Sequence, residues 1–258
     1  MRRLGLRLFR VVAIGLAAWV AYHYLAPRGL AWVVWAGVGT LALGWIAWRT
    51  VAIVRARARA RQEERWADAL VDAPRRPAAI RDLRAALASE RHPSERVHLT
   101  LVLAELLEAD GEPAAALDAL DALDLATQPE RARAVVRHAC AVAALSAGDL
   151  ERAERALAPG PIGERTLDTK IELLRAVLAI ERGDAERALA IAERERKAHD
   201  DELQIEAKVV RALAVDALGD HEDALKILRG LGDDMLAVLA LLGLPRVRRL
   251  AAEARDEG

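Results

Sequence analysis

The chain has 258 residues, and its formal net charge of −1 conceals two unlike parts. Residues 1–61 contain ten arginines and no acidic side chain, which leaves 28 basic and 39 acidic side chains in the remainder. A large acidic region argues against a nucleic-acid partner. Cys140 is the only cysteine, which excludes an internal disulfide and a cysteine-rich metal site.

Two apolar stretches lie close together near the start of the chain. Residues 11–27 are apolar apart from His23 and two tyrosines, and residues 29–48 carry no charged side chain. A hydrocarbon core about 30 Å thick needs about 20 helical residues, with about 17 as the lower limit, so each stretch can cross once. The sequence therefore predicts a two-helix transmembrane hairpin that contacts the lipid bilayer and turns at residues 26–29.

Arginines flank this hairpin unevenly. Four precede the first span and five lie between residues 49 and 61, whereas only Arg28 lies in the turn. The positive-inside rule then predicts an integral membrane protein of the bacterial inner membrane, with both termini and the acidic region in the cytoplasm. Two alternatives stay open: a cleaved signal peptide, and insertion of the second span alone. The lack of a small-x-small cleavage site after the first run favours the hairpin.

A glycine followed by an acidic residue recurs four times in the acidic region. The spacings of 37, 35 and 36 residues are typical of stacked helical hairpins, and the glycines are Gly111, Gly148, Gly183 and Gly219. We expect each glycine to end a helix with a positive φ and each acidic residue to cap the next helix. Alanines at fixed distances from the glycines predict close helix contacts. They are Ala104, Ala141, Ala176 and Ala212 in the first helices, and Ala116, Ala153, Ala188 and Ala224 in the second.

This combination resembles the tetratricopeptide repeat family, in which a small residue in the first helix, a Gly-Asp turn and an early alanine in the second helix recur. The resemblance covers about residues 97–231. The chain departs from the family where the first helices carry a large aromatic residue, because it has Thr100, Arg137, Glu172 and Lys208 at those positions. Another α-hairpin repeat family therefore stays open.

The predicted fold is all-α. Residues 1–61 form the transmembrane hairpin and its basic stem, and residues 62–258 form an α-solenoid of about four to five tetratricopeptide-like hairpins. A degenerate fifth copy is expected around Pro77, and two terminal helices are expected at Asp233–Leu242 and Pro245–Arg255. The first of these is apolar on nearly every side, and we expect it to pack beneath the second.

The resemblance implies a concave groove lined by the first helices. Most of the residues that it places there are apolar, which would suit an amphipathic helix or an extended hydrophobic segment of another protein. The alternative is that they are ordinary core residues. The implied groove residues are Leu101, Glu105, Val135, His138, Val142, Lys170, Leu173, Val177, Val209 and Leu213.

No motif for catalysis, metal binding or a cofactor is found. His138 and Cys140 lie two residues apart on a predicted helix and so point to different faces, which argues against a catalytic dyad. The sequence favours a membrane-anchored scaffold or adaptor that binds another protein and has no activity or cofactor of its own. Two alternatives stay open, a self-assembling structural membrane protein and a regulatory subunit of a membrane enzyme complex.

Overall fold

The computed structural model describes residues 60–195, 201–242 and 244–256. The predicted transmembrane hairpin and its stem lie almost wholly outside these residues. The chain divides into two compact units, residues 1–64 and residues 65–258, and the second is described here by itself. Among the described residues, no helix combines the length and the apolar character that crossing a bilayer requires.

All regular structure in the described part of the chain is helical. A helix that ends at residue 71 is followed by the short 3₁₀ helix η2. The helices after it are α3 (Arg76–Ser89), α4 (Pro93–Ala109), α5 (Pro113–Asp121), α6 (Glu130–Ala147), α7 (Leu150–Leu157), α8 (Arg165–Glu181), α9 (Ala185–Glu195), α10 (Asp201–Ala217), α11 (His221–Arg229), α12 (Asp233–Leu242) and α13 (Pro245–Asp256).

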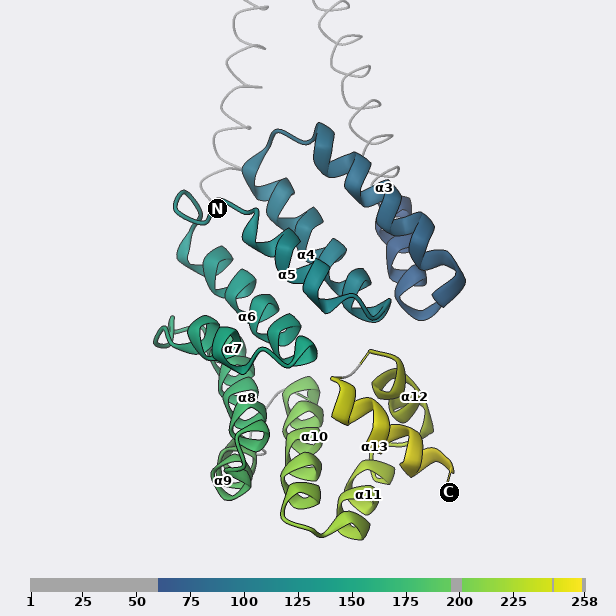
Figure 1. Ribbon diagram of the computed structural model, residues 1–258, viewed down its shortest axis with the longest axis vertical. Helices are drawn as coiled ribbons and strands as arrows, with labels where there is room; N and C mark the ends of the chain where they lie inside the picture. Colours follow the sequence, from purple (N-terminus) through teal and green to yellow (C-terminus); the bar gives the residue numbers. More distant parts are fainter. Residues whose placement is uncertain (1–59, 196–200, 243, 257–258) are drawn as a thin grey trace, which may run out of the picture. The chain divides into compact units, whose positions relative to one another are not determined.

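Helices α4 to α11 form four consecutive hairpins (Figure 1). The first helices of these hairpins, α4, α6, α8 and α10, each contact the next first helix in the chain. Each second helix, α5, α7, α9 or α11, packs against the first helix that precedes it. This arrangement of stacked hairpins is compatible with an α-solenoid, and we call it the hairpin stack.

The repeated Gly-acid turns fold largely as predicted. All four glycines have positive φ values, between 74° and 95°, a region that L side chains rarely adopt. Asp149, Asp184 and Asp220 each accept a hydrogen bond from the backbone N–H three residues later, at 2.9 to 3.2 Å. The prediction is wrong for Glu112, whose side chain makes no cap. The next residue there is Pro113, which suits the first turn because it has no N–H to be satisfied.

The predicted alanine contacts are confirmed. All eight alanines at the repeated positions of the first and second helices are buried, with at most 1% of their surface exposed. Side chains this small let helix axes approach closely, and a larger residue at any of these positions would separate the hairpins. The hairpin stack therefore owes its spacing to these positions.

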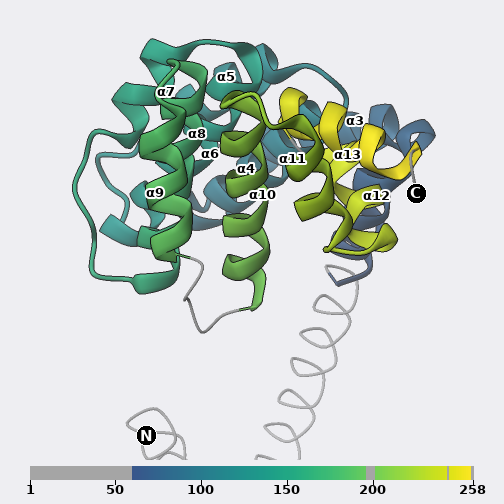
Figure 2. The ribbon, with the colours of Figure 1, turned by 90° about the horizontal axis from the view of Figure 1, so that it is seen from below.

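The two predicted terminal helices are confirmed as α12 and α13, and we call them the C-terminal helix pair. They pack extensively on each other, and α13 also contacts α10 and α11. Leu236 of α12 is buried, whereas Val238 is 46% exposed. Helix α12 also contacts α4, and Figure 2 shows the C-terminal helix pair beside α11. The last helices thus reach back to the first hairpin of the stack.

A buried arginine fixes the start of the second unit. The guanidinium of Arg76 donates hydrogen bonds to the carbonyl oxygens of Ala69 (3.3 Å), Leu70 (2.8 Å) and Ala109 (2.5 Å). These carbonyls belong to the ends of two different helices, where they lack intrahelical partners. Arg76 therefore ties the helix that ends at residue 71 to α4.

Candidate functional site

The first helices of three successive hairpins line one cavity of about 240 Å³. Seven of the ten residues predicted for the groove lie in its wall: His138 and Val142 of α6; Lys170, Leu173 and Val177 of α8; Val209 and Leu213 of α10. Leu174, Ile205, Glu206 and Val210 of the same helices also line it. We call this surface the inner face.

The other three predicted residues, Leu101, Glu105 and Val135, do not line this cavity. Leu101 and Val135 are half-buried and pack against the hydrophobic core, as the alternative interpretation expects. The same alternative fits Leu173, Val177, Val209 and Leu213, which line the cavity but are also buried members of this core. The Glu105 side chain is exposed on α4, yet partial burial of its carboxyl raises the pKa of that group. The inner face that bounds the cavity is thus built by α6, α8 and α10.

The opposite wall of the cavity comes from the C-terminal helix pair, which the sequence did not place there. Its contributions are Leu239 of α12, Leu244 just before α13, and Val247 of α13. The seven groove residues therefore face part of their own chain. No local pattern specifies this contact, because an apolar stripe shows that a helix is buried without showing against what.

The two ionisable residues predicted in this wall contribute little free charge. Burial, with a further contribution from the charge of Lys170, lowers the pKa of His138 to about 4, so its imidazole is neutral at physiological pH. The Lys170 ammonium pairs with Glu202 at 2.7 Å and with Glu206 at 3.2 Å. The cavity therefore presents mainly aliphatic surface with a neutral imidazole at one side.

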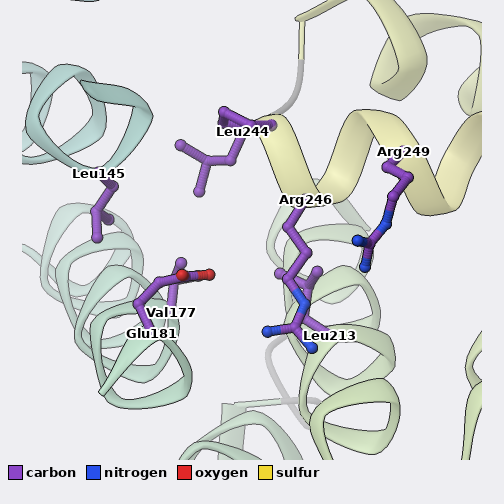
Figure 3. A pocket seen from close by; sticks show the side chains of 8 residues that line it. Leu145, Val177, Glu181, Leu213, Leu244, Arg246 and Arg249 are labelled. Carbon is purple, nitrogen blue, oxygen red and sulfur yellow. The ribbon is translucent and has the colours of Figure 1, made fainter. Parts of the chain in front are cut away.

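A second cavity of about 510 Å³ adjoins the first and shares Val177, Leu213 and Leu244 with it. Its other lining residues are Leu145, Glu181, Pro245, Arg246 and Arg249. Figure 3 shows the Glu181 carboxylate directed into this space from α8, with Arg246 reaching in from α13. Opposite charges thus border the space between the inner face and α13.

Asp216 of α10 holds α13 through charged contacts. One of its carboxylate oxygens accepts a hydrogen bond from Arg246 Nη2 at 2.8 Å and lies 3.8 Å from Arg249 Nη2. The other oxygen lies 2.8 Å from His221 Nδ1. Although burial acts in the opposite direction, the hydrogen bonds from His221 and Arg246 lower the pKa of Asp216. Its side chain is only 8% exposed, so the carboxylate is charged and largely shielded from water.

Glu108 of α4 is a second acidic group near α13. Burial, together with the charge of Glu105, raises the pKa of Glu108 to about 7, against opposing effects of Ser146 and Arg248. Ser146 Oγ of α6 lies 3.5 Å from its carboxylate. Sequence reasoning missed Glu108 because an acidic residue near a helix end is usually exposed to solvent.

The remaining titratable candidate has no activated character. Burial raises the pKa of the Cys140 thiol to about 11, so it is protonated and a poor nucleophile. Among the described residues there is no group of three or more metal-ligating side chains. The chemistry that the described cavities support is non-covalent contact between their aliphatic walls and an apolar ligand, beside charged groups of both signs.

Comparison with models of protein families, with curated proteins and with solved structures finds no match to this chain.

Proposed function

We propose that this protein is a membrane-anchored scaffold that binds another protein through a cytoplasmic domain of tetratricopeptide-like repeats. The anchor is the predicted hairpin of residues 11–48. The regular spacing of 35 to 37 residues between the Gly-acid turns supports the repeat assignment. A bilayer anchor confines the domain near the membrane and so raises its effective concentration for a membrane-associated partner. The protein needs no catalysis or cofactor of its own for this role.

The observation that carries the proposal is the shared cavity of the inner face. Three successive hairpins contribute aliphatic side chains to it, and the chain leaves about 240 Å³ there unfilled. Ligand sites are usually concave and lined mainly by apolar side chains, so an open pocket with these walls is suited to a ligand. A helix with an apolar face is the kind of ligand that such a surface accommodates.

The test compares two isoleucine-to-glutamine variants of the full-length protein during affinity purification from its native membrane. Ile205→Gln changes a half-buried residue of the inner face, whereas Ile191→Gln changes a half-buried residue of the second helix α9. We expect a stoichiometric partner with the wild type and with Ile191→Gln, and a loss of about tenfold with Ile205→Gln, as for a residue central to an interface. Equal thermal midpoints of the two variants serve as the folding control.

Equal recovery of the partner by both variants would contradict binding at the inner face. A wild-type protein that captures no stoichiometric partner but grows in mass with its own concentration would instead support the self-assembling alternative. Light scattering of the protein in detergent would measure that mass.

A further inference from the structure

The C-terminal helix pair occupies the surface to which the partner is proposed to bind. Leu239, Leu244 and Val247 face the aliphatic residues of α6, α8 and α10 across the smaller cavity. A pocket of about 240 Å³ is too small for a helix, which is about 10 Å in diameter. A partner helix can therefore lie along these residues only where the C-terminal helix pair has moved away.

The contact between the C-terminal helix pair and the inner face is interrupted by two pockets that open to solvent. Their volumes are about 510 and 240 Å³, and Leu244 borders both. Because water reaches these pockets, the helix pair covers the apolar side chains that line them only in part. By contrast, α12 and α13 pack extensively on each other and can stay together when they leave.

Polar contacts to α13 are concentrated at Asp216. Arg246 and Arg249 both reach this carboxylate, and His221 lies between Asp216 and Glu253, with Nε2 3.4 Å from the Glu253 carboxylate. Without α13, this carboxylate keeps only His221 of α11 as a partner among the described residues. An occupant that covers Asp216 again therefore has to supply new basic partners, because a covered carboxylate without them is unfavourable. The replacement for α13 should therefore carry arginine or lysine.

The connection between α11 and α12 permits the movement. It consists of Gly230, Leu231 and Gly232, and Gly232 has a φ of +86°. Two glycines among three residues give the backbone access to conformations that other residues do not reach. The helix pair can therefore rotate away about this connection without unfolding α11.

We infer that the C-terminal helix pair is a displaceable occupant of the inner face, held by Asp216 and exchanged for a partner helix that carries aliphatic residues and neighbouring basic residues. This inference rests on the proposed function and names the chemistry of the partner. Charge complementarity supports it, because acidic groups face α13 from three helices. Asp216 lies on α10, Glu181 on α8, and Glu108 on α4 near Arg248.

The first experiment measures hydrogen exchange of the full-length protein in detergent. Asp216→Asn removes the charge that holds α13, and we expect amides of residues 233–256 to exchange about tenfold faster, the size of one charge-assisted hydrogen bond. Helices α6 and α8 should keep their wild-type rates. The matched control is Glu154→Gln, which removes an ion pair with Arg182 between α7 and α8 and should leave residues 233–256 unchanged.

Arg249→Gln provides a second, milder variant at an exposed position. Its guanidinium lies at the edge of the same contact, so exchange of residues 233–256 should increase by a factor of about two to five. Acceleration that spreads equally over all helices, or no acceleration in either variant, would overturn the inference. Neither result depends on whether a partner protein exists.

The second experiment uses a labelled peptide of residues 233–256 as the probe. The protein in this experiment must lose the contacts of its own α13 but keep Asp216, which is the partner of the probe. We therefore use a full-length chain with Arg246→Gln and Arg249→Gln and call it the opened protein. We expect this protein to bind the peptide about tenfold more tightly than the wild type does, because the internal occupant is weakened. The same peptide with Arg246 and Arg249 changed to glutamate should not bind.

Equal affinity of both proteins for the peptide, or equal binding of the charge-reversed peptide, would refute the displaceable occupant. Failure of the proposed function has a different signature. In that case the peptide binds the opened protein selectively, yet the wild type and Ile205→Gln recover the same set of proteins from the membrane.

Discussion

The hairpin stack and the C-terminal helix pair are both built from aliphatic helices, but they are held in place differently. In the stack, buried alanines at every repeat let the helices approach closely. The C-terminal helix pair also has buried alanines, Ala251 and Ala254 of α13, but it meets the inner face beside two open pockets and through a charged contact at Asp216. The alanine contacts repeated along the stack are suited to a permanent structure. A charged contact beside open apolar pockets is suited to a helix pair that has to leave.

The sharpest way to test this contrast is to shorten one leucine in each region. Leu106 of α4 is fully buried, so Leu106→Ala should lower the free energy of unfolding by about 3 kcal/mol. Leu239 is half-buried and borders the smaller cavity, so Leu239→Ala should cost about 1 kcal/mol. Thermal unfolding followed by circular dichroism measures both, and equal losses would remove the distinction between the two regions.

The next effect concerns pH and arises at Glu108. Its pKa is raised from 4.5 to about 7, so between these values the folded protein binds a proton that the unfolded chain has released. Stability therefore falls as the pH rises through this window, by at most about 3 kcal/mol. Glu108→Gln should abolish this fall and make the protein more stable than the wild type at pH 8. Denaturant unfolding at several pH values provides the measurement.

His138 acts in the opposite direction in the more acidic range. Because its pKa is lowered from 6.5 to about 4, the unfolded chain binds a proton there that the folded protein does not. Stability is therefore lost as the pH falls below 6.5. The two windows overlap, so the difference between Glu108→Gln and the wild type, rather than either curve alone, isolates the effect of Glu108. A difference that does not change with pH would contradict its raised pKa.

A smaller effect distinguishes a capped turn of the stack from an uncapped one. Asp149 accepts a hydrogen bond from the backbone N–H of Arg152 at 2.9 Å, so Asp149→Ala should cost about 1 kcal/mol. Glu112 makes no such bond, and Glu112→Ala should change the thermal midpoint little. The two variants remove the same charge at equivalent turns, so equal losses would mean that charge rather than capping matters.

The smallest effect separates the two regions by salt. Added sodium chloride screens charges that are partly exposed, and Arg249 is 60% exposed at the contact with Asp216. Hydrogen exchange of residues 233–256 should therefore rise by a factor of about two between low and high salt. Exchange in α6 and α8 should change less, because buried apolar side chains hold these helices in addition to their ion pairs. A uniform response of all helices would argue against a charged contact as the selective restraint.

Local features of the fold could be predicted from the sequence, and distant ones could not. The Gly-acid turns were predictable because a positive φ and a cap depend on residues only a few positions apart. The turn at Glu112 failed even locally, because Pro113 relieves the need for a cap. The three carbonyl partners of Arg76 come from helices up to 33 residues away, and no periodicity indicates such a bond.

The same distinction applies to the candidate site. Seven of the predicted groove residues lie together because the repeat period places equivalent positions of successive first helices side by side. Their contact with Leu239, Leu244 and Val247 was not predictable, because aliphatic side chains do not encode which surface they meet. Glu108 was missed for a related reason, since its burial depends on how the helices assemble.

The contact between α12 and α4 also affects how cooperatively the domain unfolds. Stacks of repeats ordinarily fray from their ends, because a terminal repeat has a neighbour on one side only. Here α3 packs on the first hairpin, and the C-terminal helix pair covers the last hairpin and also contacts α4, so neither end has this freedom while the pair is in place. Departure of the pair would free the C-terminal end at the moment when a partner arrives, and the stack could then adjust its curvature to the helix that it receives.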